Sequence, residues 1–256
     1  MTKTSEQWLY GIHAVNAALR NESGNIKTLW VVDSGKNIRL QTLSALAEQL
    51  GITLKQVPRA ELDRRSSGGR HQGVLAQLIH APVSLGEHDL ATLLDRIVGT
   101  PLLLVLDGVQ DPHNLGACLR TADAAGVHAV LVPADRAVGL TSSVRKIASG
   151  ASVPFMQVSN LARALRCLQQ RGLWLVGASS DANNSLYSAD LKDPLAIVLG
   201  GEGKGLRRLT REHCDLLVSI PMAGNVASLN VSVATGVVLF EAIRQRLALA
   251  PSLIQA

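Results

Sequence analysis

Pro101-Leu-Leu-Leu-Val-Leu106 is the stretch that decides the fold class of this chain. It is apolar without interruption, as strands are when a parallel sheet buries both of their faces. Comparable runs follow at residues 128–132, 173–176, 195–199 and 216–220, and helical segments separate them at residues 115–125, 142–149, 161–171 and 206–213. This alternation of strand and helix predicts an α/β domain built on a parallel sheet.

A smaller α/β block precedes this domain. Its pattern predicts helices over residues 9–19, 40–50 and 59–65, and strands over residues 28–33, 52–57 and 74–79. The block ends near Ala81-Pro-Val-Ser-Leu-Gly86, whose proline and glycine are typical of a connection between domains. We therefore expect a first domain over residues 1–82, a linker over residues 83–99 and a second domain over residues 100–256.

The composition predicts a cytoplasmic protein with an aliphatic core. Hydrophobic residues make up 47% of the chain and aromatic residues only 3%. The longest apolar stretch, Val226–Phe240, is shorter than the roughly 20 residues that span a bilayer, so we expect a buried helix and no membrane partner. No apolar signal region follows Met1, and the three cysteines form no CxxC pair, as expected of reduced cysteines in the cytoplasm.

Positive charge is concentrated in the N-terminal block. The formal net charge is +5; residues 1–82 contain ten Lys/Arg and six Asp/Glu, whereas the remainder contains fifteen and fourteen. Such an excess favours a polyanionic partner. Because aromatic residues are scarce, we expect contacts to phosphates rather than a base-stacking platform.

A basic run surrounds the Ser-Ser-Gly-Gly loop of the first domain. Arg64, Arg65, Arg70 and His71 follow Arg59 within and around this loop. Flexible glycines beside arginines suit the irregular backbone of RNA, so we interpret the four residues as an RNA phosphate clamp. A solvated surface loop is the alternative.

The segment Asp107–Arg120 follows a predicted strand and opens a helix, where ligands bind in open α/β sheets. Asn114 either caps that helix through its side-chain oxygen or belongs to a catalytic site. Arg120 lies mid-helix beside Ala117 and Ala124, a smooth surface that lets a large group approach. A solvated helix arginine is the alternative for Arg120.

A glycine-rich loop, Gly200-Gly-Glu-Gly-Lys-Gly205, follows another predicted strand. It contains no GxGxxG pattern, and Lys204 is followed by Gly205 rather than by Ser or Thr, so neither a dinucleotide site nor a Walker A loop is predicted. Glycines around Glu202 allow backbone amides to approach a ligand closely. A plain glycine-rich turn is the alternative.

The third segment runs from Ile220 to Gly236. Ser228, Ser232 and Gly236 are spaced to form a stripe of small residues on one helical face, which suits tight packing against a helix or a flat ligand. Asn230 projects elsewhere, near the expected helix start, where it can form hydrogen bonds. The histidines of the chain show no metal-ligand spacing, so no metal is expected.

Taken in this order, the three segments resemble the SpoU family of RNA ribose methyltransferases within the SPOUT superfamily. The motifs are DPHNLGACLR (residues 111–120), GGEGKGL (200–206) and IPMAGNVASLNVSVATG (220–236), and the resemblance spans Pro101 to about Arg246. YGIHAVNAAL (10–19) and RHQGVLAQL (70–78) also resemble the RNA-binding domain of one branch, whose members methylate a guanosine in 23S rRNA.

The resemblance implies transfer of a methyl group from S-adenosylmethionine to a ribose 2′-hydroxyl. It also implies a deep trefoil knot, a homodimer with the active site at the interface, and a ribosomal-protein-like first domain. The implied catalytic positions are Asn114, Arg120, Glu202, Ser228 and Asn230. The implied cofactor-binding positions are Leu199, Gly200, Gly203, Ile220, Met222 and Leu229.

These residues suggest a division of roles. Arg120 stays protonated, so we expect it to bind a phosphate and stabilise alkoxide charge rather than act as a base. Glu202 either accepts a proton or orients a polar partner, while Ser228 and Asn230 position the ribose or the cofactor. The expected partner is 23S rRNA or a large-subunit assembly intermediate. The alternatives are a tRNA ribose 2′-O-methyltransferase and a non-catalytic RNA-binding or ribosome-assembly protein.

Overall fold

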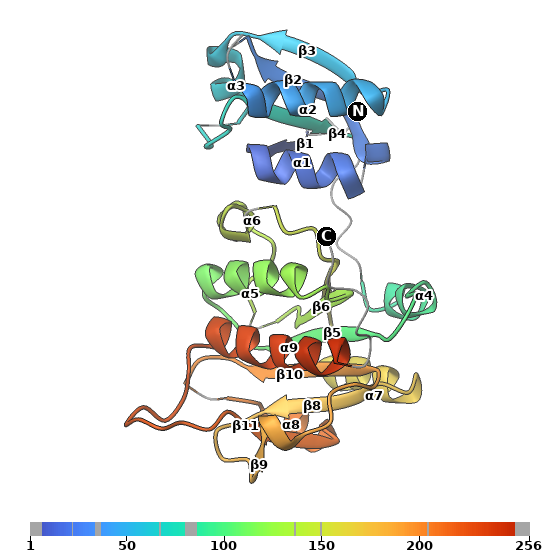
Figure 1. Cartoon of the computed structure of the whole chain (residues 1–256), viewed down its shortest axis with the longest axis vertical. Coiled ribbons are helices and arrows are strands. Elements are labelled where there is room, and N and C mark those ends of the chain that lie inside the picture. Colours follow the sequence, from blue (N-terminus) through green and yellow to red (C-terminus); the bar gives the residue numbers. More distant parts are fainter. Residues whose placement is uncertain are drawn as a thin grey trace. The chain divides into compact units, whose positions relative to one another are not determined.

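The computed structural model describes residues 7–21, 23–33, 37–66, 68–79, 86–135, 137–148, 150–203 and 205–248. The chain divides into two compact units, one of residues 1–83 with 149–152 and one of residues 84–148 with 153–256 (Figure 1). No helix among the described residues is long and apolar enough to cross a bilayer.

The first unit is a four-stranded sheet in the order β1-β4-β2-β3. The strands are β1 (Gln7–Tyr10), β2 (Ile26–Val32), β3 (Thr53–Val57) and β4 (Val74–Leu78), and the helices are α1 (Ile12–Asn21), the 3-10 turn η1 (Ser23–Asn25), α2 (Ile38–Gln49) and α3 (Arg59–Arg65). Strands β2 and β3 are parallel, whereas β4 is antiparallel to both β1 and β2. Helices α1 and α2 cover one face of this sheet, where Leu29, Val31 and Ala76 are buried.

The helix expected from Leu9 begins later than the sequence predicts. Leu9 and Tyr10 belong to strand β1, which pairs with β4, and Gly11 separates strand from helix with a φ of 100°. Only glycine adopts such a φ without strain, so this residue allows the abrupt change of direction. The apolar spacing continues across this boundary, so the sequence predicts a single helix where the structure has an edge strand followed by a helix.

The second unit is a seven-stranded sheet in the order β7-β6-β5-β10-β8-β11-β9, and all its paired strands are parallel. The strands are β5 (Leu102–Asp107), β6 (Ala129–Pro133), β7 (Phe155–Val158), β8 (Trp174–Ala178), β9 (Asn184–Ser185), β10 (Leu195–Gly200) and β11 (Leu216–Ser219). Strand β5 is buried along its whole length, as the opening apolar run predicts. The parallel sheet of the predicted fold class is therefore confirmed.

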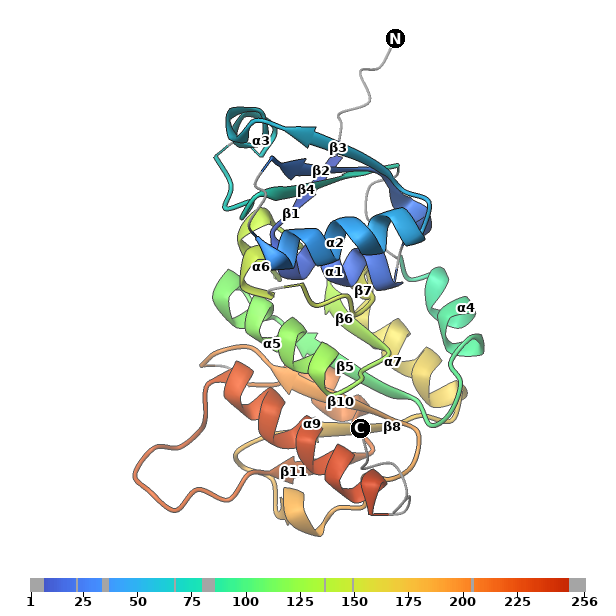
Figure 2. The same cartoon turned by 45° about the horizontal axis from the view of Figure 1, so that its top comes forward.

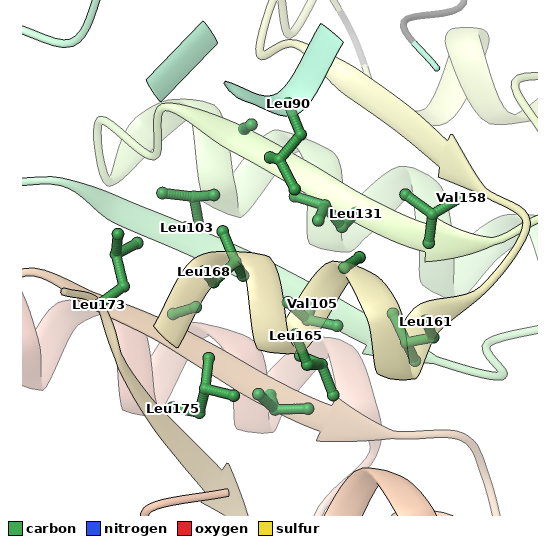
Figure 3. Close-up of a cluster of buried hydrophobic side chains, with 14 of the residues drawn as sticks. Leu90, Leu103, Val105, Leu131, Val158, Leu161, Leu165, Leu168, Leu173 and Leu175 are labelled. Atoms are coloured by element: carbon green, nitrogen blue, oxygen red, sulfur yellow. The ribbon is translucent and has the colours of Figure 1, made fainter. Parts of the chain in front are cut away.

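Helices cover both faces of this sheet. They are α4 (Asp89–Asp95), α5 (Pro112–Ala124), α6 (Ser142–Ala148), α7 (Leu161–Gln170), the 3-10 turn η2 (Leu186–Ser188), α8 (Arg208–His213) and α9 (Val231–Leu247). Figure 3 shows Leu161, Leu165 and Leu168 of α7 packed against strand residues such as Leu103 and Val105. Helix α5 packs beside α6 and α9, and α9 lies against β10 (Figure 2).

The helices of the second unit differ from the sequence prediction most clearly at two places. The expected linker, residues 83–99, contains helix α4, whose Leu90 and Leu94 are buried in the main core, so this helix belongs to the second unit. The helix expected over Val226–Phe240 begins only at Val231, because Asn230 caps it through a hydrogen bond from the Ser232 amide. Ser228 therefore precedes the helix and does not share a helical face with Ser232 and Gly236.

Candidate functional site

A cavity of about 640 Å³ lies where strands β8 and β10 end. Its walls are residues 178–181, 199–203, 205–206 and 228–231, together with Arg211. An adjoining cavity of about 80 Å³ shares five lining residues with it, residues 178–180, Ser228 and Leu229. The site thus occupies the carboxyl edge of a parallel sheet, where α/β proteins usually bind ligands.

All six residues predicted to bind a cofactor line these two cavities. Leu199, Gly200, Gly203 and Leu229 line the larger one, and Ile220, Met222 and Leu229 line the smaller. They come from two segments, one at the end of β10 and one after β11, which meet at one edge of the sheet. The fold brings together the residues that the resemblance singled out.

The glycines at the end of β10 and in the loop after it have two different roles. A Cβ on Gly200 would lie 2.0 Å from the carbonyl carbon of Gly205, and a Cβ on Gly201 would lie 2.3 Å from the carbonyl oxygen of Gly108. Gly203, with a φ of 75°, has open space around it and lines the cavity. Gly200 and Gly201 therefore allow backbone to pack on backbone, while Gly203 leaves room for a ligand.

Asp107, at the end of β5, ties this loop to the sheet. Its side chain is fully buried and accepts hydrogen bonds from the backbone N–H of Arg207, at 3.1 Å, and from Arg207 Nε. Its carbonyl oxygen accepts a hydrogen bond from the N–H of Gly201. Sequence reasoning missed this role, although a carboxylate ending a wholly apolar strand is itself a signal.

Asn114 and Asn230 are joined directly. Asn230 Nδ2 donates a hydrogen bond to Asn114 Oδ1 at 3.1 Å, across 116 positions of sequence. Capping by Asn114 is wrong, because Asp111 caps helix α5 by accepting a hydrogen bond from the His113 amide. Asn114 lies inside the helix and is buried, so its side chain is available for the contact with Asn230.

The other predicted catalytic residues fall in two places. Glu202 and Ser228 line the larger cavity with Asn230. Arg120 is exposed on α5 and lines neither cavity, and its side chain makes no hydrogen bond or ion pair within the described part of the chain. The structure of this chain does not bring Arg120 to the lining of either cavity.

One polar cluster on the cavity wall was not predicted. Arg211 donates hydrogen bonds to Ser179 Oγ at 3.0 Å and to Asp181 Oδ1 at 2.8 Å. Arg211 and then Ser179 hold the pKa of Asp181 at about 2, below its ordinary value of 3.8. The available signal was the polar run Ser179–Asp181 directly after an apolar strand. The described residues contain no group of three or more His, Cys, Asp or Glu suited to hold a metal.

The four residues of the predicted RNA clamp differ in their surroundings. Arg64 and Arg70 are exposed, and Arg64 forms an ion pair with Glu61. Arg65 stacks on two tryptophans and also pairs with Glu61. His71 is buried; its Nε2 bonds Asp63, and its Nδ1 accepts a hydrogen bond from Gly73 N–H, so it holds the loop rather than facing RNA.

The fold and the site together define an α/β protein with a ligand cavity at the carboxyl edge of its sheet and a separate basic unit. Residues 101–240 match the SpoU rRNA methylase family, and residues 8–82 match the family described as RNA 2′-O ribose methyltransferase substrate binding. The chain therefore belongs to the SpoU rRNA methylase family.

Individual proteins support this membership along nearly the whole chain. The 23S rRNA (guanosine-2′-O-)-methyltransferase RlmB of Pseudomonas syringae is 57% identical over 240 residues, which cover 93% of this chain and 95% of that protein. A crystal structure of an RNA 2′-O ribose methyltransferase has a TM-score of 0.72 at 31% identity, covering 94% and 89%. The AdoMet-bound rRNA methyltransferase from Sinorhizobium meliloti has a TM-score of 0.70 at 25% identity, covering 94% and 88%.

Proposed function

We propose that this protein transfers a methyl group from S-adenosylmethionine to the ribose 2′-hydroxyl of a guanosine in 23S rRNA. The observation that carries the proposal is the convergence of all six expected cofactor residues on one pair of adjoining cavities. The high identity to the RlmB relative supports the choice of RNA and nucleotide. Ribosomal RNA is favoured over tRNA for the same reason.

The lining of the cavities fits the chemistry of S-adenosylmethionine. Ile220, Met222 and Leu229 offer apolar surface for a flat base, and the loop containing Gly203 offers backbone groups for polar atoms. When bound, the cofactor supplies a methyl group on a positively charged sulfur. Glu202, exposed at the cavity wall, would add a negative charge to the lining of the site that holds this cofactor.

The contact between Asn114 and Asn230 fixes which of their side-chain atoms donate hydrogen bonds and which accept them. Asn230 Oδ1 already accepts hydrogen bonds from the backbone and the hydroxyl of Ser232, so its Nδ2 must donate to Asn114. Because Asn114 Oδ1 accepts that bond, its own amide hydrogens remain as donors. Amide donors stabilise an oxygen that becomes negative, which suits a ribose hydroxyl losing its proton. These two residues hold the hydroxyl and do not take its proton.

Arg120 acts on the site of a second subunit in a homodimer. Arg120 is exposed and lies on α5, which packs beside α9. The two helices are close, because a Cβ added at Gly236 of α9 would lie 3.8 Å from Thr121 Cγ2 of α5. Helix α9 exposes Val233 and Phe240, 52% and 49% accessible, an apolar surface suited to a partner copy. We also propose that the second unit contains a deep trefoil knot. In keeping with this, β10 lies in the sheet between β5 and β8, which both precede it in the chain.

A mixed dimer tests the shared site. Arg120→Ala and Asn230→Ala are each expected to be nearly inactive as homodimers. In the heterodimer one site contains both intact residues and the other lacks both, so activity should reappear when differently tagged chains are co-expressed and purified together. If Arg120 served its own subunit, both sites would carry a lesion. A heterodimer that binds cofactor but is no more active than either parent contradicts the proposal.

The first unit binds RNA through Arg64 and Arg70. Replacing both with Ala should weaken RNA binding and reduce the slope of log affinity against log salt by about 0.7 per lost contact for a single strand. Cofactor affinity should not change. Arg39→Ala, which removes another exposed arginine, is the matched control. An unchanged salt slope in the double variant counts against these contacts.

The reaction itself is tested with purified protein, labelled S-adenosylmethionine and transcripts of 23S rRNA and tRNA. We expect a 2′-O-methylguanosine in 23S rRNA only. Labelling of tRNA instead selects the tRNA-modifying alternative. Binding of RNA without cofactor binding, measured by calorimetry, selects a non-catalytic assembly protein.

A further inference from the structure

The sheet of the first unit is covered unequally on its two faces. Helices α1 and α2 lie along one face (Figure 2). On the opposite face the short helix α3 contributes Leu62 to a small cluster with Trp30 and Leu75. Part of this second face therefore remains accessible to solvent.

Strand register fixes which side chains share the accessible part. Trp8, Gln77, Thr28 and Thr53 form one row across the four strands. Lys55 lies on the same face, directly opposite Trp30. Thr53 and Lys55 are exposed, and Trp8 and Gln77 are half-buried. We call Trp8, Gln77, Thr53 and Lys55 the open sheet face.

Aromatic and cationic side chains are held together at this surface. The rings of Trp8 and Trp30 meet edge to face, with centroids 5.6 Å apart. The Arg65 guanidinium stands 4.9 Å from the Trp8 centroid and 4.1 Å from that of Trp30, and Lys55 Nζ stands 4.8 Å from Trp30. Arg65 also forms an ion pair with Glu61. These contacts fix Trp8 in place, so little side-chain entropy is lost when a ligand stacks on it.

We propose that the open sheet face binds an unpaired stretch of RNA, with a base stacked against Trp8 and a phosphate held by Lys55. The composition alone argues against base stacking, but the fold gathers three of the chain's seven aromatic residues, Trp8, Tyr10 and Trp30, on the same side of this sheet. Aromatic rings on an open four-stranded sheet are a known physical solution for binding unstacked bases. The proposal rests on RNA being the substrate.

The polar residues of the surface suit the same partner. Thr53 is exposed and carries a hydroxyl that can donate to or accept from the edge of a base lying on the sheet. Lys55 and Arg65 supply positive charge for the backbone. A protein partner would instead require a broader apolar surface than the single half-buried tryptophan offers.

The test compares two strands of equal charge bound to the full-length protein. One is a labelled uridine-rich 12-mer RNA, and the other is the same strand with abasic sites in its centre. Wild type should prefer the strand that carries bases. Trp8→Leu should bind it at least about fivefold more weakly, the loss expected for one stacked base, and should bind the abasic strand as wild type does. Lys55→Ala should weaken binding to both strands.

The matched control is Trp174→Leu, which changes an exposed tryptophan of the second unit. Its RNA affinity should equal that of wild type. A Trp174→Phe protein leaves only the tryptophans of the first unit, and base-bearing RNA should quench their fluorescence more than the abasic strand does. This measurement needs no change at Trp8, so it holds even if Trp8→Leu folds poorly.

Equal affinity of wild type and folded Trp8→Leu for the base-bearing strand overturns the proposal, as does equal quenching by both strands. Failure of the proposed function is read separately, from the absence of 2′-O-methylguanosine in 23S rRNA treated with wild-type protein. A wild-type enzyme that methylates normally while Trp8→Leu changes nothing refutes the open sheet face alone.

Discussion

Replacing Gly200 with Ala is the sharpest test of how the cofactor loop is built. The added Cβ would lie 2.0 Å from the Gly205 carbonyl carbon, 2.2 Å from its oxygen and 2.3 Å from the Leu206 nitrogen. Ordinary contacts begin at 3.4 Å, so two backbone segments must separate by about 1.4 Å. No flexible side chain is present to absorb that movement.

The expected cost follows from this overlap. Overpacking a rigid site typically costs up to about 3 kcal/mol, and backbone against backbone lies at the upper end of that range. If the loop moves instead of unfolding the domain, the same energy appears as lost ligand affinity, roughly a 100-fold weaker Kd for S-adenosylmethionine. Calorimetry measures the Kd, and thermal unfolding with and without cofactor shows whether the domain or only the loop has changed.

A second glycine provides the control. Gly224 has nothing within 4 Å of an added Cβ and is not among the glycines with positive φ, so Gly224→Ala should leave both quantities near their wild-type values. A Gly200→Ala protein that binds the cofactor within threefold of wild type, with an unchanged Tm, would refute the packing argument.

Three further outcomes are expected. Asn230→Asp should keep the helix cap and the Tm but lose most of the methyl-transfer activity, because the donor to Asn114 disappears, whereas Asn230→Ala should also lose about 1 kcal/mol of stability. Equal activity of Asn230→Asp and wild type in an initial-rate assay would contradict the role of this donor. Asp107→Asn should weaken cofactor binding about tenfold or more and lower the Tm, because it leaves the Arg207 charge without its buried partner. If calorimetry and thermal unfolding show neither change, the contact between Asp107 and Arg207 does not support the site. Arg163 forms an ion pair with Glu87 and holds the pKa of Glu87 at about 2, below the ordinary 4.5, so this pair stabilises the fold above about pH 4.5 and its contribution is lost as the pH falls towards 2. The Tm of Glu87→Gln should therefore fall less than that of wild type between pH 6 and pH 2.5, and equal falls would count against the pair.

The sequence predicted the centre of the large sheet better than its edges. Strands such as β5 and β10 are buried on both faces, so they are unbroken apolar runs that are plain to read. Strand β7 was missed because Gln157 interrupts its short apolar run, and the two-residue β9 is too short to leave a pattern. Helix α4 was hidden because it follows the proline and glycine that mark a connection.

The candidate site shows a similar division. Motif resemblance identified the residues that line the cavities, since motifs record which positions meet a ligand. It did not identify Asp107, Asp181 or Arg211, because their roles depend on which partner the fold places beside them. The burial of His71 could not be predicted from the sequence for the same reason. Its two ring nitrogens bond to Asp63 and to the Gly73 amide, and only the folded loop brings these partners to it.

The position of β5 in the large sheet has a consequence for how the protein is made. Strand β5 pairs with β10, and residues 108–194 lie between the two strands in the chain. While the chain leaves the ribosome, one edge of β5 is without its partner until those residues have been synthesised. An apolar strand with a free edge is a template for wrong pairing, and such long-range parallel contacts form slowly. We therefore expect chains that stop short of β10 to aggregate, and the cofactor site, which needs β8, β10 and β11 together, to be the last part of the domain to form.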